Sequence, residues 1–152
     1  MFRGLNSISI DDKGRIAIPA RYRDLINDEA DGILVTTIDT EERCLLMYPY
    51  PQWEEIEKKL ESLPSFHPAT RRIQRLLIGH AEELEMDRTG RVLLPQLLRE
   101  YAGLDKLAMM VGQGNKFEIW GESQWRLGRE GWIAQGLHED GEIPAELRSI
   151  SL

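Results

Sequence analysis

The sequence predicts an α+β fold in which two similar modules, each a β-hairpin followed by a short helix, lie in one chain of 152 residues. The first observation is an internal repeat: residues 11–19 read DDKGRIAIP and residues 87–95 read DRTGRVLLP, at a constant offset of 76. The second is a match between residues 45–53 and 117–125 at an offset of 72, so the first half carries four additional residues, which we expect in a loop. Repetition of this kind indicates a duplicated structural unit.

Each repeat has the pattern of two strands joined by a tight turn. Apolar and polar residues alternate on both sides of the turn, with Ile8 and Ile10 before the first one, as in a half-buried strand. Glycine accepts a positive φ without steric cost, and an aspartate side chain accepts hydrogen bonds from the amides of a turn. We therefore expect four residues to shape the two turns: Asp11, Gly14, Asp87 and Gly90.

Prolines and residue periodicity place the remaining elements. Pro19 and Pro95 suit the first turn of a helix, so short helices are expected at 19–26 and 95–102. Apolar runs predict strands at 33–38, 44–48, 107–111 and 117–120. Helical spacing and helix-start signals predict helices at 52–63 and 68–79, a further helix capped by Ser123, and a helical turn at 144–150. Trp53 and Trp125 are expected to anchor their helices in the core.

These elements predict the domain organisation. The expected parts are a first module with its following helix at 5–63, a helical connection at 64–80, a second module at 81–127 and a C-terminal tail at 128–152.

Composition limits the possible function classes. The chain has no stretch of about 18 apolar residues and no apolar signal region near Met1, so we expect a cytoplasmic protein. Cys44 is the single cysteine, which fits a reducing compartment, and we expect it to pack in a strand. The histidines His67, His80 and His138 stand in unrelated contexts, and no catalytic or nucleotide-binding motif is present. We therefore expect no enzymatic activity, no cofactor and no metal site.

The charge distribution favours a specific contact with DNA. A net charge of −7 argues against a protein that coats nucleic acid, but residues 1–23 hold five basic residues against two acidic ones. The first turn places Lys13 and Arg15 at or near its tip, where an arginine can reach a phosphate or the edge of a guanine. The alternative for Arg15 and Arg91 is an ion pair with the aspartate four residues earlier, worth ~0–1 kcal/mol when exposed. The candidate DNA-binding residues are Arg3, Lys13, Arg15 and Arg91.

The duplicated Asp-x-x-x-Arg hairpin followed by proline resembles the SpoVT–AbrB DNA-binding module. Two copies in an acidic chain that opens MFRG, together with the segments at 48–53 and 71–77, resemble the MraZ family up to about residue 125. The resemblance implies modules folded as a swapped-hairpin β-barrel with pseudo-two-fold symmetry and peripheral helices. It also implies a nucleoid-associated transcriptional regulator without enzymatic activity. Such a protein forms a ring-shaped homo-oligomer, binds direct repeats in double-stranded promoter DNA, and represses its own operon of cell-division and cell-wall genes.

The family's motif arginine corresponds to Arg15 and Arg91. The second turn departs from the first, because it has Arg88 and Thr89 where the first has Asp12 and Lys13, so the two tips differ in charge. The alternative function is an antidote-type interaction module of the swapped-hairpin class. An enzyme would need a pocket with convergent polar groups.

Two oppositely charged helix surfaces predict contacts between subunits, since head-to-tail contacts can close into rings. The alternative for the basic one is a solvated or salt-bridged surface. The residues concerned are Glu54, Glu55, Glu57 and Glu61 on the acidic side and Arg71, Arg72 and Arg75 on the basic side.

Overall fold

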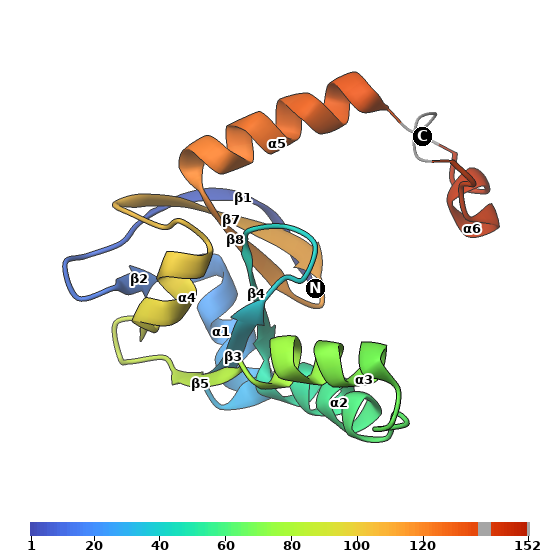
Figure 1. The fold of residues 1–152 in the computed structure, drawn as a ribbon. Helices are drawn as coiled ribbons and strands as arrows, with labels where there is room; N and C mark the ends of the chain where they lie inside the picture. The colour runs from blue at the N-terminus through green and yellow to red at the C-terminus, as the bar shows by residue number, and fades with distance from the viewer. Residues whose placement is uncertain (137–140, 152) are drawn as a thin grey trace. The chain divides into compact units, whose positions relative to one another are not determined.

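The computed structural model describes residues 1–136 and 141–151 and has a mixed α+β architecture, as the sequence predicts (Figure 1). His138 lies outside the described residues. The chain divides into two compact units, Met1–Glu122 and Ser123–Leu152. The first unit contains both repeats and every strand that the structure describes.

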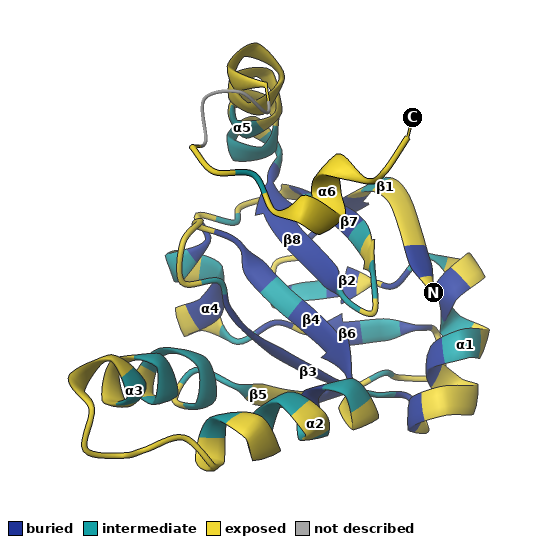
Figure 2. Ribbon diagram, turned by 90° about the vertical axis from the view of Figure 1, so that its right-hand side faces the viewer, coloured by how far each residue is buried: buried dark blue, intermediate teal, exposed yellow. Residues whose placement is uncertain are grey.

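A six-stranded sheet forms the centre of the first unit, and all its pairings are antiparallel. In order across the sheet, its strands are β1 (Phe2–Ser9), β7 (Leu107–Gly114), β8 (Phe117–Gly121), β4 (Leu45–Pro49), β3 (Ile33–Ile38) and β5 (Glu82–Glu85). The predicted strand at 33–38 is confirmed, and the others differ from their predictions only at the ends. Figure 2 shows β3, β4 and β8 as mostly buried, which agrees with their apolar sequences.

A separate two-stranded sheet joins the two repeats. It pairs β2 (Arg15–Ala17) with β6 (Arg91–Leu93), and its central pair is Ile16 opposite Val92. These two residues are equivalent at the offset of 76, so a pseudo-two-fold axis relating the repeats passes through this pair. The backbone hydrogen bonds that flank the sheet obey the same symmetry: they run from Ile18 N to Gly90 O at 2.8 Å and from Leu94 N to Gly14 O at 2.9 Å.

The expectation of local hairpins is only partly met. A single bridge, between Ile10 just after β1 and Ile16 of β2, closes the first hairpin, because β2 pairs mainly with β6 of the other repeat. The barrel that the family resemblance implies is not observed among the described residues. Strands β1 and β5 form the two edges of an open sheet, and β2 and β6 are only three residues long. A period of two shows that a strand has one buried face, but it does not identify the strand's partner.

Helices follow the strands of each repeat. They are α1 (Ala20–Ala30), α2 (Tyr50–Glu61), α3 (Pro68–Ile73) with its π-helical continuation η1 (Gln74–Ile78), and α4 (Gln96–Tyr101). Helix α1 extends four residues beyond its prediction, because Tyr22, Ile26 and Ala30 continue one buried face. It ends where Asp31 and Gly32 both adopt positive φ, at 51° and 74°.

The main core lies between the repeats. Ile16 and Val92 belong to it, and an aromatic group formed by Phe2, Tyr22 and Phe117 has ring centroids 4.2–5.7 Å apart. A smaller cluster contains Val35, Tyr48 and Trp53. Trp53 is 3% exposed, so its predicted role as a helix anchor is confirmed.

The second unit consists of helices in the described residues. Helix α5 spans Glu122–Gln135 and α6 spans Ala145–Arg148, which confirms the helical turn expected at 144–150. Ser123 does not cap α5, because the helix already begins at Glu122. Trp125 is half-buried and not part of either core cluster, and its ring packs edge-on against Trp132 at 5.7 Å. Among the described residues, no helix is both long and apolar enough to cross a bilayer.

Candidate nucleic-acid interface

The carboxylate of Asp11 organises the first turn. Its Oδ1 accepts hydrogen bonds from the backbone N–H groups of Lys13 and Arg15, each at 2.9 Å, and its Oδ2 accepts one from Arg15 Nε at 2.7 Å. Gly14 N donates to Asp11 O at 3.0 Å while Gly14 adopts a φ of +92°. The backbone N–H of Arg15, followed by its side chain, lowers the pKa of Asp11 from 3.8 to about 2. The predicted turn-structuring role of Asp11 and Gly14 agrees with this geometry.

The second turn has the same backbone but holds its arginine differently. Asp87 Oδ1 accepts hydrogen bonds from Arg91 N at 2.9 Å, Thr89 N at 2.9 Å and the Thr89 hydroxyl at 2.8 Å. Arg91 Nε donates to Thr89 Oγ1 at 3.1 Å and lies 3.4 Å from Asp87 Oδ2. The backbone N–H of Arg91, followed by the Thr89 hydroxyl, lowers the pKa of Asp87 to about 2. The threonine thus replaces part of the ion pair found in the first turn.

The ion pairs considered as an alternative to DNA contact are present. The side chains of Arg15 and Asp11 are 36% and 37% exposed, and those of Arg91 and Asp87 are 42% and 44% exposed. Both contacts use Nε, and the Nη groups of the two arginines make no hydrogen bond to the described residues. The two functions are therefore compatible, since each guanidinium is oriented by its turn and still presents donors to solvent.

The structure adds two arginines that sequence reasoning missed. Arg99 Nε donates to Leu94 O at 3.0 Å, and its guanidinium lies against Gly14 of the other repeat. Arg23 Nε donates to Ile18 O at 2.7 Å, and its guanidinium lies against Gly90. The internal repeat could have identified this pair. Arg23 and Arg99 are also separated by 76 residues, and each lies four positions after the proline of its repeat.

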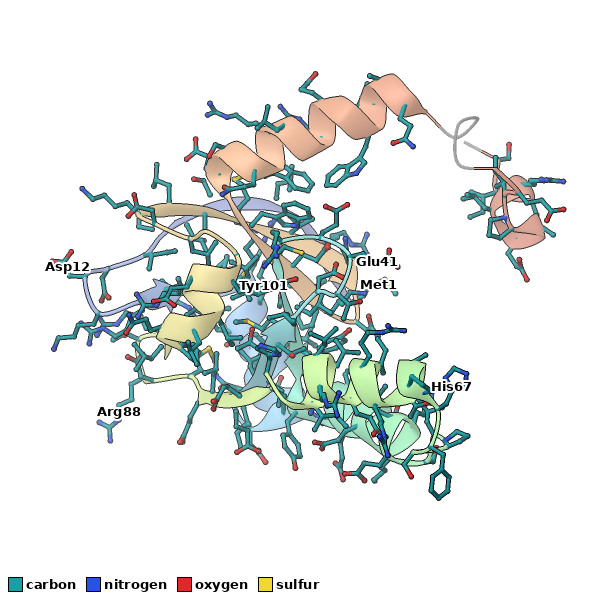
Figure 3. The ribbon with its side chains drawn as sticks, viewed as in Figure 1. Met1, Asp12, Glu41, His67, Arg88 and Tyr101 are labelled. Atoms are coloured by element: carbon teal, nitrogen blue, oxygen red, sulfur yellow. The ribbon has the colours of Figure 1, made fainter. Side chains whose placement is uncertain are left out.

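The paired strands bring three of the four candidate DNA-binding residues to one side of the first unit. Lys13 and Arg15 belong to the first turn, Arg91 belongs to the second, and β2 and β6 join the two turns. Figure 3 shows Asp12 and Arg88 projecting from the two turns on the same side, with Met1 on the opposite side. Arg3 lies six residues before the end of β1, about 20 Å along the strand. The structure therefore separates Arg3 from the turns, and its role stays a prediction.

The surface formed by these groups is basic although the chain has a net charge of −7. Asp11 and Asp87, each with a pKa of about 2, stay ionised at neutral pH and count as negative charges on this surface. The basic residues still outnumber the acidic ones. The surface, called the turn face below, has six basic and three acidic residues: Lys13, Arg15, Arg23, Arg88, Arg91 and Arg99, with Asp11, Asp12 and Asp87.

A second group of ionisable side chains lies away from the turns. Oxygen or sulfur atoms of Asp39, Cys44 and Glu118 lie within 4.8 Å of one another, which makes this the one set of potential metal ligands found among the described residues. Cys44 Sγ lies 3.7 Å from Asp39 Oδ2 and 3.8 Å from Glu118 Oε2, so either carboxylate can accept the hydrogen bond from its single S–H. Burial, reinforced by both carboxylates, raises the pKa of the Cys44 thiol, and burial also raises the pKa of Glu118. A protonated thiol is a poor nucleophile and a poor metal ligand. Cys44 is fully buried, as expected, but it lies just before β4 and not in a strand, because β4 begins at Leu45.

The fold and the turn face define a protein with two related modules that share one basic surface. Residues 1–76 and 77–130 match the family described as "MraZ protein, putative antitoxin-like". Three relatives, each matched over the full length of both chains, carry the name transcriptional regulator MraZ. They come from Coxiella burnetii (strain RSA 493 / Nine Mile phase I) at 68% identity, Legionella pneumophila (strain Paris) at 55% and Halorhodospira halophila (strain DSM 244 / SL1) at 51%. The chain belongs to the MraZ family.

Proposed function

We propose that this protein is a transcription regulator that binds specific double-stranded DNA through the turn face and has no enzymatic activity. The observation that carries this proposal is the pairing of β2 with β6, which gathers basic side chains from both repeats on one side of an acidic chain. A local basic surface on an acidic protein favours a specific contact, because the remaining surface repels the phosphate backbone.

Arg15 and Arg91 are the proposed base-reading residues. Each guanidinium is fixed at Nε by its own turn, and its Nη groups can donate to O6 and N7 of a guanine in the major groove. Lys13 and Arg88 extend from the same turns and are suited to phosphate contacts, which position a protein without reading sequence. The turns carry different charges, because residues 11–15 hold two acidic and two basic groups and residues 87–91 hold one acidic and two basic groups.

The resemblance to the MraZ family supports a more specific proposal about location, assembly and target genes. We propose that the protein acts in the cytoplasm at the nucleoid, where a ring of subunits binds direct repeats upstream of its own operon and represses cell-division and cell-wall genes. A subunit with few phosphate contacts binds weakly alone. A ring makes later contacts intramolecular and raises avidity by ~10²–10⁴. Head-to-tail subunits present their turns in the same sense, which matches direct repeats rather than a palindrome.

Charge on the helices following the first module supports contacts between subunits. Arg71, Arg72 and Arg75 are exposed, as are Glu55 and Glu61 of α2, so both charged surfaces are accessible. Two members of these surfaces also make contacts within the subunit: Glu54 pairs with Lys58 at 3.2 Å, and Arg71 Nε donates to Ser65 O at 3.1 Å.

The proposal is tested by titrating the purified full-length protein into labelled duplex DNA from upstream of its own gene, at fixed salt. We expect affinity to collapse when one repeat unit is left, and the log–log salt slope to fall as units are removed, because fewer counterions are displaced. Inserting about half a helical turn, ~5 base pairs, between units should weaken binding as well. Equal affinity for one unit and for three would exclude the ring mechanism. Equal affinity for the upstream DNA and a shuffled duplex would exclude specific binding.

An antidote-type interaction module remains the second candidate, because the family description includes the words "antitoxin-like". In the second unit, α5 exposes the apolar side chains of Leu127 and Ile133, at 77% and 70%, which is a feature of helices that bind partners. This candidate predicts no specific DNA affinity for the purified protein, so the titration above separates the two functions.

A further inference from the structure

We infer that Arg99 and Arg23 are positioning residues, each of which holds the DNA-contacting turn of the opposite repeat in its binding conformation. The inference rests on the proposed function, since it assumes that the turns contact DNA. It adds that neither turn is complete within its own repeat. The first turn needs an arginine from the second repeat, and the second turn needs one from the first.

The contact of Arg99 with the first turn has two parts. Leu94 is linked to Gly14 through its N–H, which donates to Gly14 O at 2.9 Å, and to Arg99 through its carbonyl, which accepts from Nε at 3.0 Å. The guanidinium then occupies the space that a side chain at Gly14 would need, since a Cβ built there would lie 2.6 Å from Arg99 Cζ and Nε and 2.9 Å from Nη2. Gly14 is consequently buried although Lys13 beside it is exposed.

The same arrangement recurs at the second turn. Ile18 N donates to Gly90 O at 2.8 Å, Ile18 O accepts from Arg23 Nε at 2.7 Å, and the Arg23 guanidinium lies where a side chain at Gly90 would be. Every residue in this set is 76 positions from its counterpart in the first set. The same contact therefore occurs in both repeats of this chain, although the residues around it differ, which indicates that it belongs to the duplicated unit.

The geometry favours a supporting role over direct contact with phosphate. In each case Nε is committed to a backbone carbonyl and the guanidinium packs against the glycine of the turn. The next residue after Gly14 is Arg15, so the guanidinium supports the backbone that orients the base-reading side chain. Contacts that read bases require placement within about 0.5 Å, and such precision depends on supporting contacts. Lysine lacks the planar group and the Nε donor, and it cannot replace arginine in this role.

The assignment predicts a crossed pattern of coupling. Because Arg99 supports the turn that carries Arg15, removing Arg99 should lower DNA affinity only while Arg15 is present. The loss of affinity should be the same in the presence or absence of Arg91, which lies on the other turn. A double-mutant cycle measures this dependence directly.

The experiment uses the full-length protein and duplex DNA from upstream of its own gene, with affinity measured by fluorescence anisotropy over a salt series. The variants are Arg99→Ala, Arg99→Lys, Arg15→Ala and Arg91→Ala, together with the doubles that combine Arg99→Ala with each of the last two. Arg21→Ala is the matched control, because Arg21 also packs over a glycine of positive φ, Gly4, and also forms a side-chain hydrogen bond, to Asn6. Thermal melting of each variant reports its folding.

We expect Arg99→Ala and Arg99→Lys to weaken binding by about tenfold, within the range for losing one bidentate base contact. The log–log salt slope should stay at the wild-type value, since no phosphate contact is lost. The effect should disappear in the Arg15→Ala background and persist in the Arg91→Ala background. Arg21→Ala should bind like the wild type.

Several results would overturn the inference while leaving the proposed function intact. Two concern single variants: wild-type affinity for Arg99→Ala, or wild-type affinity for Arg99→Lys. A third is a loss of affinity from Arg99→Ala that is as large in the Arg15→Ala background as in the wild type. A fourth is a salt slope reduced by about 1 per bound subunit, which would make Arg99 a phosphate contact. If Arg99→Ala melts well below the wild type, Arg99→Lys, which keeps the charge and the aliphatic stem, carries the test. Failure of the wild-type protein to prefer the upstream DNA would instead reject the proposed function.

Discussion

Replacing Ile16 with alanine tests whether the two repeats form one cooperative unit. Ile16 is fully buried at the centre of β2, opposite Val92, where the pseudo-two-fold axis passes. The change removes three buried carbon atoms, which at about 0.8 kcal/mol each gives about 2.4 kcal/mol of lost transfer free energy. The cavity left behind adds to this, so we expect the free energy of unfolding to fall by about 3–4 kcal/mol.

The neighbouring Arg15→Ala variant provides the contrast. Arg15 is one residue away on the other face of the strand and makes an exposed ion pair, so its removal should cost ~0–1 kcal/mol. Both variants and the wild type would be unfolded in urea at one protein concentration, with the signal followed by circular dichroism. A loss below about 1 kcal/mol for Ile16→Ala, or separate transitions for the two repeats, would refute the interlocked arrangement.

Three further predictions concern ionisable side chains. Because Cys44 is buried and its thiol has a raised pKa, it should react with an aromatic disulfide far more slowly in the folded protein than in denaturant; similar rates would contradict this. Burial raises the pKa of Glu118 above 4.5, so its contribution to stability should decline as pH rises past 4.5. Glu118→Gln should flatten that decline, and a pH profile parallel to the wild type would count against it. Asp11 should titrate near pH 2 by carboxyl NMR, so the stability it provides is present above 3.8 and lost as pH falls toward 2; a midpoint near 4 would show that its turn contacts are absent.

Local patterns in the sequence were sufficient to predict most elements. The β-branched run at 33–38 gave a strand with the observed ends, because such residues suit a buried, pleated backbone. The aspartate and glycine of each repeat predicted the turns, because the hydrogen bonds that the aspartate accepts come from residues close to it in the sequence. Elements that end through tertiary contacts were harder. Helix α1 continues past Ile26 because Ala30 still packs on the core.

Strand partners and the supporting arginines could not be predicted in the same way. The pairing of β2 with β6 joins residues 76 positions apart at their centre, and no local preference specifies it. Ser123 resembles a helix cap in sequence, yet α5 begins one residue earlier. Arg23 counted only as one of the five basic residues of 1–23, and nothing in the local sequence assigned a role to Arg99. Their contacts with Gly90 and Gly14 become visible only when the two repeats are placed together.

The most direct test of DNA recognition by the turn face compares specificity rather than bare affinity. The affinities of the wild type and of Arg15→Ala would be measured at one salt concentration, for duplexes that carry the upstream repeats and for shuffled duplexes of equal length. We expect the wild type to prefer the repeats by at least ~10³-fold, as specific DNA-binding proteins do, and Arg15→Ala to lose most of that preference while still binding shuffled DNA weakly. An unchanged preference in Arg15→Ala would contradict the central claim.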